Sequence, residues 1–330
     1  MTSIAIIGAG LAGITLAREL RGVAEVTVFE KSRGYGGRMA TRHAEPYQFD
    51  HGAQFFTARS AEFKQVLQEV QVQSAMVLWE PKIITLQAGQ KPFKRDWFEP
   101  HYVGVPGMNA LCKALAGDCN VQLRSEVSRI MREGAGWRLT GADEFSYGVF
   151  DWVISAVPSP QALTLMPADF AFREAMDAVN FSPCFALMLG LSTQPPLNFD
   201  AAVVRDSPIG WIAVESSKSG RADAFSLLIH SDNDWAQSHI DSNPEEVTEL
   251  LISALHEVTG ISSKQIEHKV LHRWRYARAE SFAGEDYLLD GSNHLAACGD
   301  WCQGGRVEDA FLSGARLGLK LKSLLRFSTS

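Results

Sequence analysis

The chain has 330 residues, of which 46% are hydrophobic and 21% charged, with a net charge of −7. That length allows two lobes with sizeable cores, while the negative charge argues against nucleic acid or an anionic membrane surface as a main partner. No apolar run reaches the roughly 18 residues of a membrane span, and no secretion signal precedes the first predicted strand, so we expect a cytoplasmic protein. The five cysteines are odd in number and unpatterned, so we expect reduced thiols and no metal site.

Residues 4–30 carry the strand–turn–helix–strand pattern of a dinucleotide-binding unit. The apolar run 4–7 leads into Gly8-Ala9-Gly10-Leu11-Ala12-Gly13, a helical segment to about residue 20 follows, and a second apolar run ends at Glu30. Gly8 makes the tight turn, Gly10 lets the backbone approach a pyrophosphate, and Gly13 lets the helix pack against the sheet. The acid accepts hydrogen bonds from the adenosine ribose, and the helix N-terminus faces the phosphates. We predict a Rossmann-like unit with cofactor contacts at Gly8, Gly10, Ala12, Gly13, Glu30 and Lys31.

The loop after Glu30 favours FAD over NAD. Gly36 and Gly37 allow the backbone to run beside a long ligand, and Arg38 can reach its phosphates. This Gly-Gly-Arg sequence resembles the signature of the flavin amine oxidase superfamily, in which FAD stays bound throughout turnover.

The middle of the chain alternates between the predicted FAD domain and a second domain. The pattern predicts a helix over 60–72 with Phe63, Val66, Leu67 and Val70 on one face, short strands within 76–103, and a helix from Pro106 to Gly117. The segments 120–124, 127–132, 136–140 and 152–156 read as a meander that returns to the flavin sheet. The superfamily resemblance implies that the backbone at Val127 pairs with the adenine ring.

We expect most of the second domain to lie within residues 160–280. Strands at 184–192, 210–215, 224–230 and 266–276 fit an antiparallel sheet, and a helix at 244–258 has Asn243 as its N-cap and Gly260 past its end. We expect this sheet to cover the reactive face of the flavin, with helices on its far side.

The run 295–300 is a strand of small residues that ends in Gly299-Asp300, and a helix follows from about 306 to 324. The resemblance implies that Gly299 and Asp300 contact the ribityl chain or phosphates of FAD. It also implies that the backbone N–H of Val307 donates to flavin O2 or N1, where a helix N-terminus stabilises the negative charge of the reduced ring. Cys302 follows this motif, whereas the tethering cysteine of some amine oxidases precedes it, and His51 is no better placed, so we predict noncovalent FAD.

The chain as a whole resembles the renalase family, in its bacterial form, within the same superfamily. The most specific match is Asp50-His51-Gly52-Ala53-Gln54-Phe55-Phe56-Thr57, and others are residues 105–108, 154–158 and 274–276. The resemblance implies an FAD-dependent oxidase that converts the 2- and 6-dihydro isomers of NAD(P) to NAD(P)+ and reduces O2 to hydrogen peroxide.

Hydride transfer from such a dihydropyridine to flavin N5 restores an aromatic ring and removes no heteroatom proton, so we assign no acid–base catalyst. Along the strand 266–276, Arg273 and Arg275 share one face and Trp274 and Tyr276 the other, and the sequence leaves open which pair meets the ligand and which is core or solvated surface. We add Gln54 and Phe55 to the flavin contacts, and the candidate substrate contacts are Phe56, Thr57, Arg59, Trp274 and Arg275.

The predicted architecture is an α/β Rossmann-like FAD-binding domain (1–58, 104–160 and 281–330) with a discontinuous α+β substrate domain (59–103 and 161–280) built on an antiparallel sheet. Alternative functions are an amine or polyamine oxidase, a desaturase or isomerase of a lipid-like substrate, and a noncatalytic dinucleotide-binding sensor. The sequence does not decide between NAD and NADP forms, or the oligomeric state.

Overall fold

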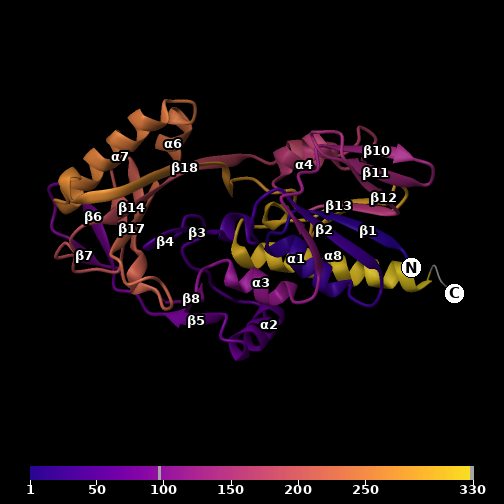
Figure 1. The fold of residues 1–330 in the computed structure, drawn as a ribbon, viewed down its shortest axis with the longest axis horizontal. Coiled ribbons are helices and arrows are strands. Elements are labelled where there is room, and N and C mark those ends of the chain that lie inside the picture. The colour runs from indigo at the N-terminus through magenta and orange to yellow at the C-terminus, as the bar shows by residue number, and fades with distance from the viewer. Residues whose placement is uncertain (96–97, 328–330) are drawn as a thin grey trace.

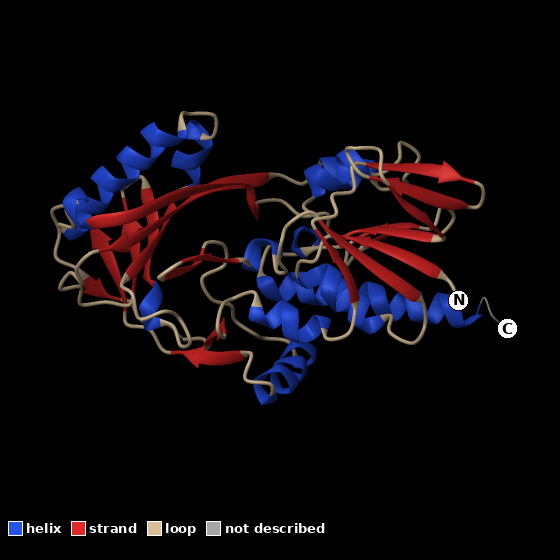
Figure 2. Cartoon of the chain, viewed as in Figure 1, coloured by secondary structure: helices blue, strands red, loops and turns tan. Residues whose placement is uncertain are grey.

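The computed structural model describes residues 1–95 and 98–327 and divides them into two lobes joined by several passages of the chain (Figure 1). Positions 96 and 97, within the predicted strand region 76–103, lie outside the described residues. One lobe is built on a six-stranded sheet and the other on a seven-stranded sheet, and Figure 2 shows helices on the outer faces of both.

The six-stranded sheet has the order β19-β20-β13-β1-β2-β9 and confirms the predicted Rossmann-like domain. Its strands are parallel except for β19, as expected for a glycine turn followed by crossover helices. The strands are β1 (Ser3–Ile7), β2 (Glu25–Glu30), β9 (Asn120–Leu123), β13 (Trp152–Ser155), β19 (Leu288–Asp290) and β20 (Leu295–Ala297).

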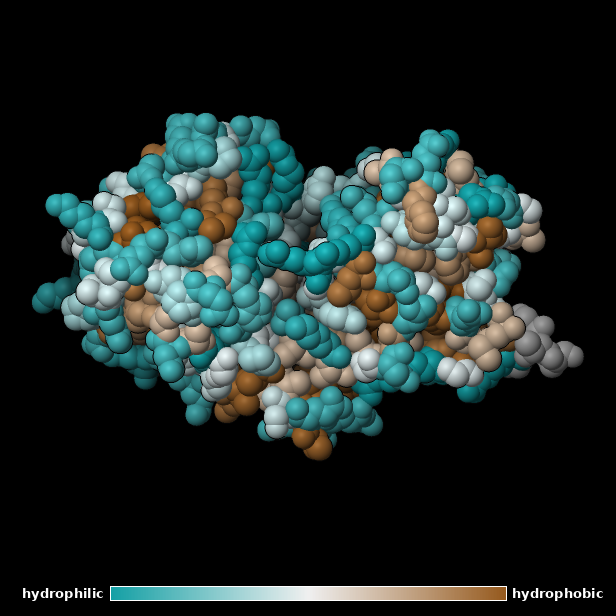
Figure 3. Space-filling view, in the orientation of Figure 1, coloured by the Kyte–Doolittle hydropathy of each residue, from teal (hydrophilic) through white to brown (hydrophobic). Residues whose placement is uncertain are grey.

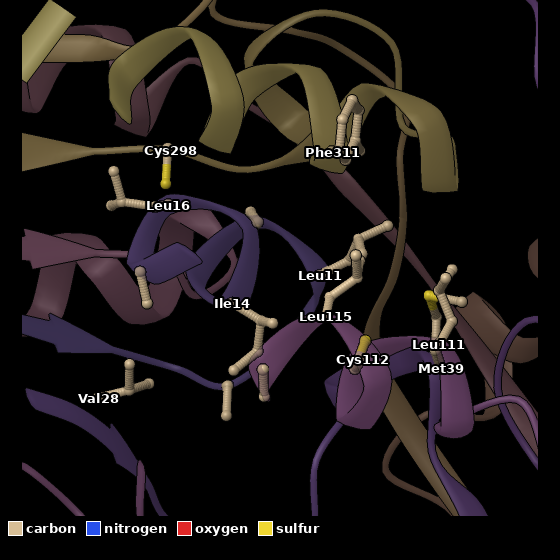
Figure 4. Close-up of a cluster of buried hydrophobic side chains, with 14 of the residues drawn as sticks. Leu11, Ile14, Leu16, Val28, Met39, Leu111, Cys112, Leu115, Cys298 and Phe311 are labelled. Atoms are coloured by element: carbon tan, nitrogen blue, oxygen red, sulfur yellow. The ribbon is translucent and has the colours of Figure 1, made fainter. Parts of the chain in front are cut away.

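Alternate residues of β1 serve two different cores. Ile4 and Ile6 pack with α1 (Leu11–Glu19), α3 (Ala110–Ala116) and α8 (Val307–Phe327), a cluster that Figure 4 shows around Leu11, Ile14 and Leu16. Ala5 and Ile7 face the opposite core, which includes a three-stranded sheet of β10 (Arg129–Glu133), β11 (Gly136–Thr140) and β12 (Ser146–Phe150). The sheet is therefore covered on both sides, which explains why β1 is apolar from Ile4 to Ile7.

The seven-stranded sheet has the order β18-β14-β17-β16-β15-β6-β7. All neighbouring strands are antiparallel except β15 and β6, which run parallel, so the predicted antiparallel sheet is correct apart from that pair. Its strands are β6 (Ile83–Gln87), β7 (Phe93–Lys94), β14 (Phe181–Leu191), β15 (Ala201–Arg205), β16 (Ile209–Val214), β17 (Ser226–Ser231) and β18 (Ile266–Ala279).

Two helices, α6 (Asn233–His239) and α7 (Pro244–Thr259), cover the outer face of this sheet. The helical cover and α7 were predicted, whereas α6 was not located from the sequence. The Asn243 side chain accepts a hydrogen bond from the N–H of Glu245, and Gly260 ends α7 in a left-handed conformation. Both ends of this helix therefore follow from residues that the sequence displays.

Short elements connect the lobes. The hairpin of β3 (Thr41–Ala44) and β4 (Tyr47–Asp50) lies under the seven-stranded sheet, where Tyr47 and Phe49 pack on it. Single-turn 3₁₀ helices occur at Gly37–Met39, Glu215–Ser217, Ser263–Gln265 and Asp300–Cys302. Among the described residues, no helix combines the length and apolar character needed to cross a membrane, and Figure 3 shows a largely hydrophilic face with an indentation between the lobes.

Several segments differ from the sequence-based expectation. The helix predicted from Pro106 begins at Ala110, and β10 begins only at Arg129, so Val127 lies in the preceding loop. The segment 120–124 joins the six-stranded sheet as β9, whereas β10, β11 and β12 form a sheet of their own.

Parts assigned to the substrate domain pack in the lobe of the six-stranded sheet instead. α4 (Ser159–Leu165) and α5 (Arg173–Asp177) bury Ala162 and Met176 against the six-stranded sheet. α2 (Ala61–Val72), β5 (Met76–Trp79) and β8 (His101–Gly104) join the core around α8. The apolar residues of these segments show that they are buried, but not against which sheet.

Candidate functional site

A cavity of 1290 Å³ lies between the two lobes and is lined by residues from both. Small-molecule sites usually measure about 300–1,000 Å³, so this volume is large enough for a long cofactor together with a second ligand. Twelve of the residues singled out in the sequence line it: Gly8, Gly10, Ala12, Glu30, Lys31, Arg38, Val127, Trp274, Arg275, Gly299, Asp300 and Val307.

The glycine turn has the shape that a dinucleotide requires. Gly8 has a φ of +108°, which favours glycine, and a Cβ at Gly13 would overlap the carbonyl oxygen of Gly8, so the helix could not approach the turn. A Cβ on Gly10 would meet only the carbonyl oxygen of Gly36, at 4.0 Å, so the space beside Gly10 is open. The open side is the one on which a pyrophosphate would lie.

Glu30 ends β2 at the cavity wall with its carboxylate held in place. One oxygen accepts the N–H of Ala9 at 2.8 Å, and the other accepts the N–H of Ser32 at 2.8 Å. Each carboxylate oxygen keeps further lone-pair capacity, so both can still accept ribose hydroxyls. The residue types and their geometry fit the adenosine half of FAD.

The two motifs from opposite ends of the chain meet in this cavity. Arg38 donates two hydrogen bonds to the Asp300 carboxylate, one of them at 2.9 Å, and a third to the carbonyl of Ala277 at 3.3 Å. The N-terminus of α8 begins beside them at Val307, which also lines the cavity. A helix N-terminus and a guanidinium at one wall suit the phosphates and the reduced ring of a flavin.

None of the residues from Gln54 to Arg59 lines the cavity. The Gln54 side chain bonds the carbonyls of Asp50 and Gly52 and accepts from Lys218, and Phe55 packs edge-on against His101 with ring centroids 4.2 Å apart. Arg59 pairs with Glu99 at the surface.

Phe56 is core, with its ring against Phe63, and Thr57 is half-buried outside the lining. This placement gives no support to cofactor contacts at Gln54 and Phe55 or substrate contacts at Phe56, Thr57 and Arg59. The segment instead fills the space between α2, β8 and the buried ion pairs described below. Gly13 also lies outside the lining, because its role is to let α1 pack.

The two faces of β18 contact different neighbours, although Arg273, Trp274, Arg275 and Tyr276 all line the cavity. Trp274 donates from Nε1 to the carbonyl of His51 at 2.8 Å and stacks on the His51 ring. On the opposite face, Arg275 pairs with Asp241 and Arg273 donates to the carbonyl of Ser242, both in the connection between α6 and α7. The aromatic face of the strand therefore meets the β3–β4 hairpin, and the arginine face meets the helical layer.

Three histidines at this wall were not predicted as site residues: His51, His230 and His272 all line the cavity. Burial, His272 and Arg42 lower the pKa of His51 to about 3, and burial lowers that of His230 to about 4. Burial and Arg42 also lower the pKa of His272. All three are therefore neutral at physiological pH. For His272 a signal existed, since it alternates with Trp274 on one face of the strand.

A network of buried charges lies behind the Asp50–Gln54 segment and links the lobes. Arg221 donates to the Asp50 carboxylate from two nitrogens, one at 3.1 Å, and Lys218 donates to Glu215 at 2.7 Å. Glu215 in turn accepts the backbone N–H of Asp50 at 2.9 Å. Burial favours the neutral acid, but Lys218 and Arg221 hold the pKa of Asp50 below its usual value, whereas burial raises that of Glu215 despite Lys218.

The cysteines are poor candidates for a tether to the cofactor. Cys302 is buried outside the cavity lining, and burial raises its thiol pKa to about 12. Cys184 lines the cavity, but burial raises its pKa to about 11, so it stays a thiol. The described residues contain no cluster of His, Cys, Asp and Glu that could hold a metal ion.

Two lobes joined around a glycine-lined dinucleotide cradle define an oxidoreductase that binds a flavin. Residues 85–317 match the model of the flavin containing amine oxidoreductases, and residues 6–70 match that of an NAD(P)-binding Rossmann-like domain. The chain belongs to the flavin-containing amine oxidoreductase family, whose members are flavin-dependent, typically with FAD.

Solved structures agree on the fold across nearly the whole chain. A putative protoporphyrinogen oxidase from Exiguobacterium sp. 255-15 has a TM-score of 0.79 at 11% identity, over 98% of this chain and 99% of that chain. A cyclohexylamine oxidase from Brevibacterium oxydans IH-35A has 0.74 at 12%, and a putrescine oxidase bound to putrescine has 0.73 at 12%, each with the same coverage. At these identities the likeness establishes the fold alone.

Proposed function

We propose that the protein is an oxidase with noncovalently bound FAD that converts 2- and 6-dihydroNAD(P) to NAD(P)+. The hydride leaves ring carbon C2 or C6 of the substrate, and with one solvent proton and O2 it ends in hydrogen peroxide. FAD, when bound, supplies the acceptor for the hydride and passes the two electrons to O2. The protein has to bind the ring, orient it and hold the site in shape.

The charge of the cavity is the observation that carries this proposal. Although the chain is acidic overall, the described lining residues include eight lysines and arginines (Lys31, Arg33, Arg38, Arg42, Arg273, Arg275, Arg278 and Arg306) and four carboxylates (Glu30, Glu126, Asp232 and Asp300). Three of these cations pair with carboxylates outside the lining, Arg275 with Asp241, Arg278 with Glu280 and Arg306 with Asp309, which leaves the lining cations in slight excess. Such an excess favours anionic ligands such as dinucleotides over ammonium ions. This argues for a phosphate-bearing substrate and against an amine.

The neutral histidines at the wall are also consistent with a dihydropyridine. Such a substrate loses no heteroatom proton, so the site needs no strong base near the reacting carbon. An amine must instead be deprotonated before it is oxidised, and the buried imidazoles of His51 and His230, with pKa values of about 3 and 4, are weak acceptors for that proton.

Anaerobic mixing of the flavin-loaded protein with borohydride-treated NAD+ tests the proposal. We expect fast bleaching of the flavin by the 2- and 6-dihydro isomers and hydrogen peroxide on admission of O2. Ordinary NADH offers its hydride from C4, and a misplacement of about 1 Å costs on the order of a hundredfold in rate. Rapid bleaching by putrescine or cyclohexylamine, without response to the isomers, would establish an amine oxidase. If none of these compounds bleaches the flavin, the remaining candidate function is a noncatalytic dinucleotide-binding sensor.

A further inference from the structure

One wall of the cavity is formed by three rings in mutual contact, His51, His272 and Trp274, which we call the ring wall. The rings of His51 and Trp274 are stacked, with centroids 5.3 Å apart and planes at 23°, and His272 meets Trp274 edge-on at 4.3 Å. The backbone carbonyl of His51 accepts from Trp274 Nε1 at 2.8 Å and lies 3.3 Å from His230 Nε2. The ring wall is thus held from both the β3–β4 hairpin and the seven-stranded sheet.

The ring wall carries no charge at neutral pH. Burial and the neighbouring cations lower the pKa of His51 to about 3 and lower that of His272 as well. A surface of flat neutral rings favours a planar heteroaromatic ligand, which can lie against it by stacking or edge contacts. The Asp50 carboxylate acts on His51, but it is buried and paired with Lys218 and Arg221, so it offers little attraction to a cationic ligand.

Arg42 lies next to these rings and differs from the other arginines on the substrate side. Its strand β3 pairs it with Phe49 of β4, it is half-buried, and it lines the cavity near enough to lower the pKa of both His51 and His272. Within the described part of the chain its side chain makes no hydrogen bond or ion pair. By contrast, Arg275 pairs with Asp241, and Arg273 donates to a backbone carbonyl.

A half-buried guanidinium with unused donors is suited to a ligand anion. Its five N–H groups match the oxygens of a phosphate bidentately, and the opposite charges make these hydrogen bonds stronger than those to a neutral acceptor. We propose that Arg42 binds the phosphate on the nicotinamide ribose of the substrate while the nicotinamide lies at the ring wall. This rests on the proposed function, and it makes the site selective for phosphate-bearing dihydronicotinamides over the uncharged riboside.

The test compares three substrates that share one ring. The 6-dihydro forms of nicotinamide riboside, its mononucleotide and NAD are mixed anaerobically with wild type, Arg42→Gln and Arg42→Lys, and flavin reduction gives a dissociation constant and a limiting rate for each. Arg42→Gln should weaken the mononucleotide and NAD forms by roughly 10- to 150-fold, the range of a lost charge-assisted hydrogen bond. The riboside and the limiting rates should not change. Arg42→Lys should fall between, because it keeps the charge but not the fork.

Arg205→Gln is the matched control. It removes the same charge from an exposed position on β15 outside the cavity lining, so it should leave all three dissociation constants unchanged. Equal weakening of the riboside and the mononucleotide by Arg42→Gln, or no weakening of either, would overturn the assignment.

A second readout separates this inference from the proposed function. Oxidised nicotinamide mononucleotide and riboside are titrated into the flavin-loaded protein, and binding is followed by the change in flavin absorbance without turnover. If wild type is not reduced by any dihydronicotinamide, the proposed function fails. Preferential loss of mononucleotide binding in Arg42→Gln would still support the phosphate site, whereas unchanged mononucleotide binding would refute it.

Discussion

Two alanine substitutions in the glycine turn should affect different properties: Gly10→Ala the binding of FAD, and Gly13→Ala the stability of the cofactor-free protein. Gly10 has an extended backbone, with φ −74° and ψ 178°, that alanine adopts readily, and its Cβ would project into open space 4.0 Å from the nearest protein atom. Gly10→Ala should therefore change the free energy of unfolding of the cofactor-free protein by less than about 1 kcal/mol, because the poorer N-cap and the lower backbone entropy of the unfolded chain oppose each other. It should weaken FAD binding, because the new methyl group occupies the side on which the pyrophosphate lies.

The magnitude follows from overpacking. Forcing a methyl group into a filled contact costs about 1–3 kcal/mol, which corresponds to a dissociation constant for FAD roughly 5- to 150-fold higher. Gly13→Ala is the matched variant, because its Cβ would overlap the Gly8 carbonyl and the Cβ of Ala156 lies 3.1 Å away. It should lower the free energy of unfolding of the cofactor-free protein by about 1–3 kcal/mol or more.

Urea denaturation of cofactor-free protein and fluorescence titration with FAD measure the two quantities separately. Full FAD affinity in Gly10→Ala would refute the placement of the pyrophosphate beside Gly10. Unchanged stability in Gly13→Ala would refute the contact between α1 and the turn.

Three further predictions address other parts of the site. Glu30→Ala should weaken FAD binding by about 1–3 kcal/mol through lost ribose hydrogen bonds, and retention of full flavin after dialysis would contradict it. Lys218→Met leaves the buried Glu215 without its partner and should lower the free energy of unfolding, measured in urea, by about 3–5 kcal/mol. A change below about 1 kcal/mol would show that the ion pair of Lys218 with Glu215 does not stabilise the fold. The folded pKa values of His51 and His230, about 3 and 4, lie below the unfolded value of about 6.5, so the unfolded state binds more protons and stability should fall as pH drops from about 6.5 to 4. His230→Asn should make that fall shallower by up to about 1.4 kcal/mol per pH unit, and an unchanged slope would mean that His230 is charged in the fold.

The sequence predicted those parts of the fold that short-range patterns determine. The β1–α1–β2 unit follows from glycine spacing and apolar runs within 30 residues, and α2 begins after Ser60, whose side chain accepts the N–H of Phe63. The sequence did not locate α6 or the strands β12 and β15. Nor did it show that α4 and α5 pack on the six-stranded sheet, because an apolar face does not specify its partner.

The sequence likewise predicted only those parts of the candidate site that a short-range pattern marks. Glycine and acid positions of the cofactor cradle were recognisable because each has one backbone role at a fixed spacing. The contacts of Asp50 with Arg221 and with Glu215 bring segments more than 160 residues apart together, and no local pattern marks them. Glu215 and Lys218, by contrast, are only three residues apart. Gln54 and Phe55 were assigned to the flavin because they follow the Gly-Gly-Arg loop, but the chain turns there toward this network.

The strand order of the FAD lobe constrains how the protein matures during translation. β20 and α8 complete the sheet and cover α1, and they come from residues 295–327, although β1 and the glycine turn are made first. A nascent chain on the ribosome therefore exposes the apolar surface of α1 until almost all of these residues have emerged. Cofactor capture must follow translation of this region, and a premature stop before residue 295 would leave a product with an unfinished sheet edge, a surface that favours aggregation and degradation.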